Sequence, residues 1–337
     1  MKFYPPSRYA VTGCFPDCIR SGISPHCTPA EMDENLHRYK ELTGSLPAFA
    51  ITWAPQFDAF RFPLELMEVM DTRGVTPDVI LWPYGPEDLG GGCLDQINSG
   101  SLDDVLRASA REVYDWSYGG RRACMAQFGT EVTLGHYPWS ATNNGGCPAG
   151  PAKYVAAHRR IHGIFAEAGC ELTWLWHTLA NFTGEPLNDP VQYYPGDEIA
   201  DWVGFGLYRD HVGGLWETFQ SGFAESMRQM AFVWGRKPGY VELMCQEQAG
   251  DTAFKADFLR ECFDGLAGHV NAVGYWDAFT ALVDPVRRSV PTPKFVRAPS
   301  NRMPVPAAMG IDSSTAALAA YRAGVGGPWY TDKARYA

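Results

Sequence analysis

The amino-acid sequence predicts an α/β protein built on a single (β/α)8 barrel, the TIM-barrel fold, over residues 1–284. Eight short apolar runs, each long enough for one buried strand, recur at a spacing of roughly 30 residues. Segments with helical patterning separate them, and no long linker interrupts the alternation. Strands that alternate with helices form a parallel sheet, and eight such units close it into a barrel.

Strands are expected where apolar residues run continuously, and helices where the apolar residues follow a helical period. The predicted strands are 8–15, 47–53, 78–84, the first half of 123–140, 171–177, 202–208, 238–244 and 270–276. The predicted helices are 28–40, 63–72, 102–118, 151–168, 216–231 and 251–266. Thr28 with Glu31 three residues later has the capping-box pattern, and Gly74 suits a helix C-terminus.

Residues 285–337 differ from the barrel in composition. The chain is rich in Pro, Arg and Ser after Asp284, and an Ala-rich helix is predicted near 313–322. We expect this C-terminal extension to pack on the barrel or to be partly disordered, without a second core.

The fourth strand ends in a single carboxylate, Glu131, beside a loop that carries His136, Tyr137 and Trp139. A buried strand that ends in one acid next to aromatic residues is costly unless something binds there. A structural role is the alternative, in which Glu131 caps a helix or pairs with an arginine.

The carboxyl ends of the other strands also carry mainly aromatic and acidic residues, and in a barrel these ends form the active site. The residues at these ends are Trp53, Trp82, Tyr84, Trp176, His177, Tyr208, Glu242, Trp276 and Asp277. Flat aromatic faces suit sugar rings, and carboxylates suit acetal chemistry. We therefore expect a polysaccharide or oligosaccharide substrate, although a single strand-end Trp is more often part of the core.

Glu131 and Glu242 lie on the fourth and seventh predicted strands, which face each other across the mouth. Two carboxyl groups about 5 to 5.5 Å apart support retaining hydrolysis, in which one acid protonates the leaving oxygen and the other attacks the anomeric carbon. The sequence thus predicts a retaining glycoside hydrolase. We expect endo action on a polymer, which the spacing of the two acids does not itself decide.

The net charge of −10 argues against a nucleic-acid partner, because the phosphate backbone would be repelled. No apolar run is long enough to span a membrane. The residues after Met1 do not have the pattern of a signal peptide, so any leader would lie outside this chain. We expect a monomer that needs no cofactor and no metal.

Nine cysteines are present, six of them in loops or at strand ends. These six are Cys14, Cys18, Cys27, Cys93, Cys147 and Cys245. Their spacing does not match paired zinc ligands, so several of them are predicted to form disulfides on the loop side of the barrel. Disulfides would indicate an extracellular or otherwise extracytoplasmic location.

The segment 194–208, Tyr-Pro-Gly-Asp-Glu-Ile-Ala-Asp-Trp-Val-Gly-Phe-Gly-Leu-Tyr, resembles the YPGDEYVDWVGxDxY segment of glycoside hydrolase family 26. The likeness extends from about Pro47 to Trp276 and includes Phe62–Leu66 and Arg73–Pro77. That family has a (β/α)8 barrel of clan A and contains β-mannanases, with some β-1,3-xylanases and mixed-linkage β-glucanases. The resemblance implies the same fold and a β-linked polysaccharide substrate.

By this resemblance Glu131 matches the family's acid/base, Glu242 its nucleophile, and Tyr208 the tyrosine that holds the nucleophile. Strand seven is about one residue short between Pro238 and Glu242, so Glu247 is a second candidate for the nucleophile. The predicted substrate-binding residues are Tyr208, Trp82, His136, Trp139, Trp176 and Trp276.

The motif around Glu131 departs from the family pattern. Thr130 replaces a His, His136 replaces a Trp, and Thr133 with Leu134 replace Asn-Gly, while Tyr137 and Trp139 are kept. These positions lie near the cleaved bond, so the substrate need not be mannan.

Two other functions fit parts of the sequence. One is a carbohydrate-binding barrel that has lost catalysis, which the altered motif favours. The other is a metal-dependent hydrolase that uses His136, His177 and His211, although no His-x-His pair ends a strand.

Overall fold

The structure is a computed structural model of the 337-residue chain. It describes residues 1–5, 9–15, 28–54, 60–83, 94–179, 188–209, 218–233, 235–245, 251, 253–273, 276–282, 311–312, 314–332 and 335–336.

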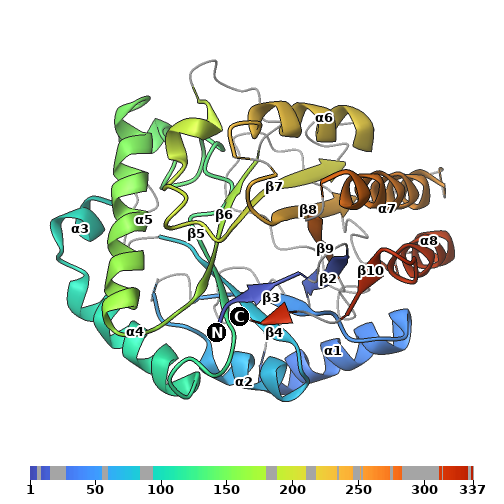
Figure 1. The fold of residues 1–337 in the computed structure, drawn as a ribbon, viewed down its shortest axis with the longest axis horizontal. Helices are drawn as coiled ribbons and strands as arrows, with labels where there is room; N and C mark the ends of the chain where they lie inside the picture. Colours follow the sequence, from blue (N-terminus) through green and yellow to red (C-terminus); the bar gives the residue numbers. More distant parts are fainter. Residues whose placement is uncertain are drawn as a thin grey trace.

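Eight parallel strands form a closed barrel surrounded by helices (Figure 1). The strands are β2 (Ala10–Phe15), β3 (Phe49–Trp53), β4 (Thr76–Leu81), β5 (Met125–Phe128), β6 (Thr173–Thr178), β7 (Trp202–Arg209), β8 (Gly239–Cys245) and β9 (Trp276–Leu282). Each strand pairs with its neighbour in sequence, and β2 pairs with β9 to close the ring. The predicted barrel is therefore confirmed.

The helices lie outside this ring. They are α1 (Pro29–Thr43), α2 (Leu64–Thr72), α3 (Leu94–Ser99), α4 (Asp103–Trp116), α5 (Ala149–Glu167), α6 (Phe219–Gln229), α7 (Phe254–Val273) and α8 (Thr315–Val325), with the short 3-10 helices η1 (Thr142–Asn144) and η2 (Pro190–Tyr193). The predicted capping box is present, because Thr28 accepts from the Glu31 backbone and the Glu31 carboxylate accepts from the Thr28 N–H.

The eighth strand is misplaced in the sequence-based prediction. Residues 270–273 form the last turn of α7, and the strand begins only at Trp276. The physical reason is that the apolar residues before Trp276 continue the apolar pattern of α7, while the run Phe279–Leu282 pairs with β2.

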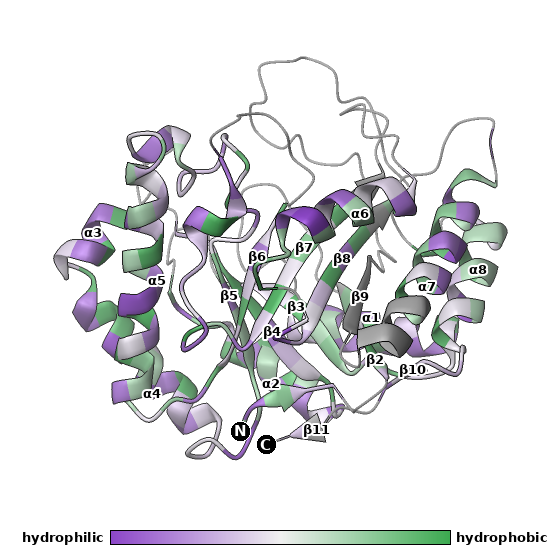
Figure 2. Cartoon of the chain, turned by 45° about the horizontal axis from the view of Figure 1, so that its top comes forward, coloured by the Kyte–Doolittle hydropathy of each residue, from purple (hydrophilic) through white to green (hydrophobic). Residues whose placement is uncertain are grey.

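The core has two parts, separated by the sheet. Inside the barrel, bulky side chains pack together, among them Phe49, Ile51, Trp202 and Tyr240. The alternate residues of the same strands face outward and pack under the helices. Figure 2 shows the apolar residues concentrated on the central strands, with hydrophilic residues on the surrounding helices.

The two chain termini close one end of the barrel. β1 (Phe3–Tyr4) pairs antiparallel with β11 (Arg335–Tyr336), and both termini lie at the bottom of Figure 2. The Phe3 ring is fully buried and stacks on Trp202 at a centroid distance of 5.7 Å. The Phe3 carbonyl accepts from the Trp202 indole at 2.9 Å.

Replacing Phe3 by Ala is expected to destabilise the protein by about 3 kcal/mol, because it removes a buried ring and leaves a cavity. Chemical denaturation of the variant against wild type measures this loss. Val105→Ala, at an exposed position on α4, is the matched control and should cost well under 1 kcal/mol. Equal losses in the two variants would show that the N-terminal segment does not contribute to the barrel core.

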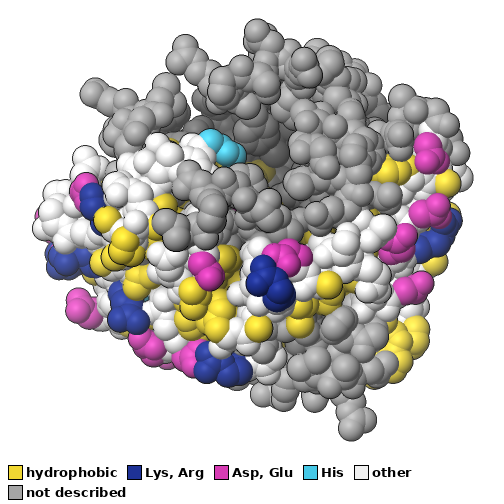
Figure 3. Space-filling view, turned by 90° about the horizontal axis from the view of Figure 1, so that it is seen from above, with side chains coloured by type: hydrophobic (Ala, Val, Ile, Leu, Met, Phe, Trp, Pro, Cys, Tyr) yellow, Lys and Arg dark blue, Asp and Glu magenta, His cyan; other side chains and the backbone are white. Residues whose placement is uncertain are grey.

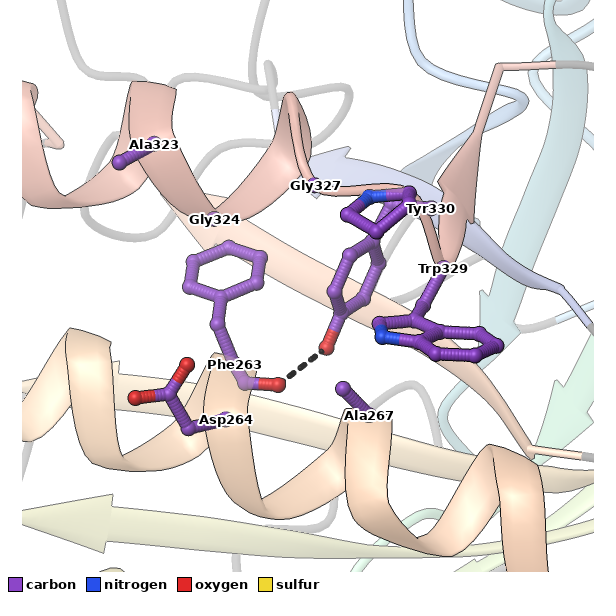
Figure 4. A pocket seen from close by; sticks show the side chains of 9 residues that line it. Phe263, Asp264, Ala267, Ala323, Gly324, Gly327, Trp329 and Tyr330 are labelled. Carbon is purple, nitrogen blue, oxygen red and sulfur yellow. Dashed lines mark hydrogen bonds between the residues drawn. The ribbon is translucent and has the colours of Figure 1, made fainter.

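The C-terminal extension provides the helix that completes the ring. α8 packs between α7 and α1, and β10 (Tyr330–Thr331) pairs with β2. Gly324 allows the close approach, since a Cβ there would overlap the Phe263 ring. Figure 4 shows the hollow that remains beside this contact, where the Tyr330 hydroxyl donates to the Phe263 carbonyl at 2.9 Å.

The disulfide prediction is wrong for three of its cysteines, because Cys14, Cys147 and Cys245 form no disulfide. Cys14 is a free thiol buried in the core, and burial raises the pKa of its thiol well above the ordinary value. The Cys147 thiol donates to the Asn188 side-chain oxygen at 3.9 Å. Cys18, Cys27 and Cys93 lie outside the described residues. None of the described helices is long and apolar enough to cross a membrane.

Candidate active site

Glu131 follows β5 in a strained backbone conformation. Gly129 has φ +53°, and Glu131, which has a side chain, has the same positive φ. A non-glycine residue in the left-handed region costs about 1 to 3 kcal/mol and is concentrated at functional sites. The surrounding structure holds it in place, since the Glu131 N–H donates to the His177 carbonyl at 3.1 Å.

The loop after Glu131 folds back on the carboxylate. The Tyr137 hydroxyl donates to Glu131 Oε2 at 2.7 Å, and the Glu131 side chain is buried, with 9% exposure. The Tyr137 ring stacks on Trp139 with centroids 4.4 Å apart. The Trp139 indole in turn donates to the Thr130 carbonyl at 2.9 Å, so the loop fixes both sides of Glu131.

Glu242 lies on β8 with a side chain 24% exposed. Its Oε2 is 3.8 Å from Nδ1 of His177 on β6. Two residues earlier on the same face, the Tyr240 ring contacts the His177 ring edge to face, with centroids 5.3 Å apart.

The strand register places Glu131 and Glu242 at the same end of the barrel. In a parallel sheet, residues that pair across strands share a face. His177 pairs with Gly204, which pairs with Tyr240, so all three face the interior. Glu242 is two residues after Tyr240 on the same, inward face of β8. The Glu131 N–H donates to the His177 carbonyl, which places Glu131 just past His177 in the direction of the strands' carboxyl ends. Both acids therefore lie at the carboxyl ends of the strands.

Figure 3 shows a hollow in the upper half of the surface in that view. A histidine side chain lies beside it. Trp82 follows β4 and is half-buried, with its indole donating to the Thr130 hydroxyl at 3.1 Å. Its ring lies 6.0 Å from Tyr137 and 5.8 Å from Trp53, centroid to centroid.

Trp139 and Trp176 are not exposed at all. The Trp176 ring packs against Tyr194 and Phe232 on the helix side of the sheet. Neither residue presents a face to solvent, so both differ from the sugar platforms that the sequence suggested.

Trp276 begins β9 in register with Gly239, the first residue of β8. This is the amino end of the strand, because the strand runs on to Leu282, so Trp276 does not lie at the mouth as its predicted role required. Tyr208 belongs to β7 and pairs with Met244, and its side chain lies outside the described atoms. Glu247 and His211 lie outside the described residues.

His136 is exposed next to the site. Desolvation lowers the pKa of its imidazole, and the Glu131 carboxylate works in the opposite direction. Its ring contacts Tyr137 at a centroid distance of 4.4 Å. Among the described residues no group of three His, Cys, Asp or Glu side chains could hold a metal ion.

Two contacts at the site are absent from the sequence-based prediction: Tyr137 to Glu131 and His177 to Glu242. The sequence places Tyr137 in the loop beside Glu131, but it does not identify the hydroxyl as a donor to that carboxylate. The sequence predicts His177 at the carboxyl end of its strand and as a possible metal ligand, but not as a contact of Glu242. Alternation along β6 puts Trp176 and His177 on opposite faces, and the register of β6 against β7 shows that His177 faces inward.

Comparison with solved structures identifies the fold. An endo-β-1,4-mannanase catalytic domain from Bacillus sp. JAMB-750 has a TM-score of 0.66 and 14% identity, and the match covers 96% of this chain and 87% of that one. The modular endo-β-1,4-mannanase from Cellulomonas fimi gives 0.60 and 14%, with 96% and 72% covered. A β-mannanase from a symbiotic protist of the termite Reticulitermes speratus, in complex with a gluco-manno-oligosaccharide, gives 0.54 and 13%, with 96% and 88% covered.

The fold is that of the family 26 glycoside hydrolases. The sequence itself matches no protein-family model and no curated protein. At 13–14% identity the comparison shows a shared fold, and the role of each side chain at the site rests on its own contacts.

Proposed function

We propose that this protein is a retaining glycoside hydrolase that cleaves a β-linked polysaccharide of the mannan type internally. Glu131 is the acid/base and Glu242 is the nucleophile. The observation that carries this proposal is the strained, buried Glu131, held by the Tyr137 hydroxyl at the same end of the barrel as Glu242.

The surroundings of the two carboxylates suit different roles. Glu131 is buried and Glu242 only partly buried, so the acid/base is proposed to be the more enclosed of the two groups. Glu242 is partly exposed, and β8 carries no other acidic residue. Tyr208 is proposed to help hold Glu242, and Trp82 to stack on a sugar ring next to His136.

Structural neighbours support the substrate class. Those named above are mannanases, and one of them holds a gluco-manno-oligosaccharide. For this chain the changed residues around Glu131 leave mannan, glucomannan, β-1,3-xylan and mixed-linkage β-glucan as the polymers to compare. An extracytoplasmic location stays a prediction, and it now rests on the polymeric substrate rather than on disulfides.

A screen of the purified protein against these polymers, with mass analysis of the products, tests the proposal. The expected result is a series of oligosaccharides from at least one polymer. Added methanol should give methyl glycosides, since only a glycosyl-enzyme intermediate is intercepted in this way. Binding of a polymer without turnover would instead favour the carbohydrate-binding barrel.

A further inference from the structure

One residue contacts both proposed catalytic acids. His177 is the inward-facing residue near the end of β6, the strand next to β5, and it is 1% exposed. Its carbonyl accepts from the Glu131 N–H at 3.1 Å, and its Nδ1 lies 3.8 Å from Glu242 Oε2. The first contact uses the backbone, so only the second depends on the imidazole.

The imidazole is neutral at ordinary pH. Burial lowers the pKa of His177 to about 3, although the backbone of Phe205 on β7 works in the opposite direction. Among the described residues, the titratable groups that face the ring are Glu242 and Tyr240 on β8, and Glu131 lies beyond the backbone contact. A neutral imidazole carries one N–H, which can be donated from Nδ1.

We propose that His177 is a positioning residue for Glu242, whose carboxylate it aims and keeps ionised by donating from Nδ1. The 3.8 Å separation has to shorten by less than 1 Å to reach hydrogen-bond length. Such contacts are often long in an unliganded site and tighten when substrate binds. A hydrogen bond to the ionised form of a carboxylate lowers its pKa, so the imidazole extends the pH range in which Glu242 can attack.

Three substitutions separate this role from packing. His177→Leu keeps most of the side-chain volume and removes the donor. His177→Asn places an amide nitrogen where Nδ1 was, whereas His177→Gln places one where Nε2 was. The geometry therefore predicts that Asn restores the function of His177 and that Gln restores less of it.

The first readout is the titration of Glu242 itself by carbon NMR of side-chain-labelled glutamate, assigned by comparison with Glu242→Gln. We expect the pKa of Glu242 to rise by about one unit in His177→Leu and to return towards wild type in His177→Asn. The second readout is the pH profile of kcat/KM. Its acid limb should move up by the same amount, with kcat about tenfold lower and KM little changed.

This inference rests on the proposed function, in which Glu242 is the nucleophile, but the NMR titration needs no turnover. A wild-type protein that cleaves no glycan would remove the proposed function and leave the titration to decide the contact. An unchanged Glu242 titration in His177→Leu would overturn the inference. Equal effects of Leu and Asn would do the same, because they would show that packing alone matters.

Discussion

Glu242→Ala is expected to lower turnover of the polymer by roughly a thousandfold or more, because the substitution removes the proposed nucleophile, the group that would form the covalent bond to the sugar. Sodium azide should restore part of the activity by entering the space left by the carboxylate. The azide product should have the inverted anomeric configuration, since azide then attacks from the side on which Glu242 stood. Proton NMR of the anomeric signal measures both the rate and the configuration.

The matched variant is Glu131→Ala, which removes the acid and leaves the nucleophile. Polymer cleavage should fall strongly, whereas aryl glycosides with activated leaving groups should still react at the first step, because these need no proton. Azide should now give a product with retained configuration. Full activity of Glu242→Ala would move the nucleophile to Glu247, which Glu247→Ala would reveal, or would rule out the mechanism.

The positions of the two acids follow from the sequence because they are fixed by strand order. A buried apolar run that ends in an acid places that acid at the mouth of a barrel, and the interval between Glu131 and Glu242 fits the intervening strands and helices. The conformation of Glu131 is different in kind. Its positive φ is accompanied by contacts with Tyr137 in the same loop and with His177 on β6, which the local sequence does not specify.

Counting aromatic residues at strand ends does not predict which of them face the barrel interior. Neighbouring residues on a strand point to opposite faces, so Trp176 and His177 cannot both face the barrel interior. Trp176 lies under the helices, and His177 lies beside Glu242. The strand-end position was predictable, but the face was not decided until the register of β6 against β7 was known.

The predicted position of the eighth strand was wrong for a different reason. A short apolar run fits either a helix end or a strand, and local pattern does not decide between them. The pairing of Phe279–Leu282 with β2, at the opposite end of the chain, selects the later run. This position depends on the pairing that closes the barrel, and the local sequence carries no information about that pairing.

Asp78→Asn is expected to stabilise the protein by about 4 kcal/mol at pH 8, and by much less at pH 4. Asp78 lies inside the barrel, fully buried, where it pairs in register with Ile51 and Met125. Burial raises the pKa of its carboxyl to about 7, and the Gln127 amide, which donates to Oδ2 at 2.6 Å, offsets only part of this. A rise of about three units over the unfolded carboxyl corresponds to about 4 kcal/mol.

The sign follows from proton linkage. The folded state holds the proton of Asp78 more tightly than the unfolded chain does, so its contribution is most favourable below about pH 4. The free energy of unfolding falls as pH rises towards 7, where the folded protein also loses the proton. Asn does not titrate, and its amide group can donate to Gln127 Oε1, which has no partner in the described structure.

Urea denaturation of wild type and variant between pH 4 and pH 8 measures this difference. Asp104→Asn, at a fully exposed position on α4, is the control and should give a nearly constant offset. Asp78 lies near the amino ends of the strands, away from Glu131 and Glu242, so glycosidase activity at its optimum should be unchanged. Two stability curves that run parallel across this range would show that Asp78 is ionised in the folded barrel, with its charge balanced by a group other than Gln127.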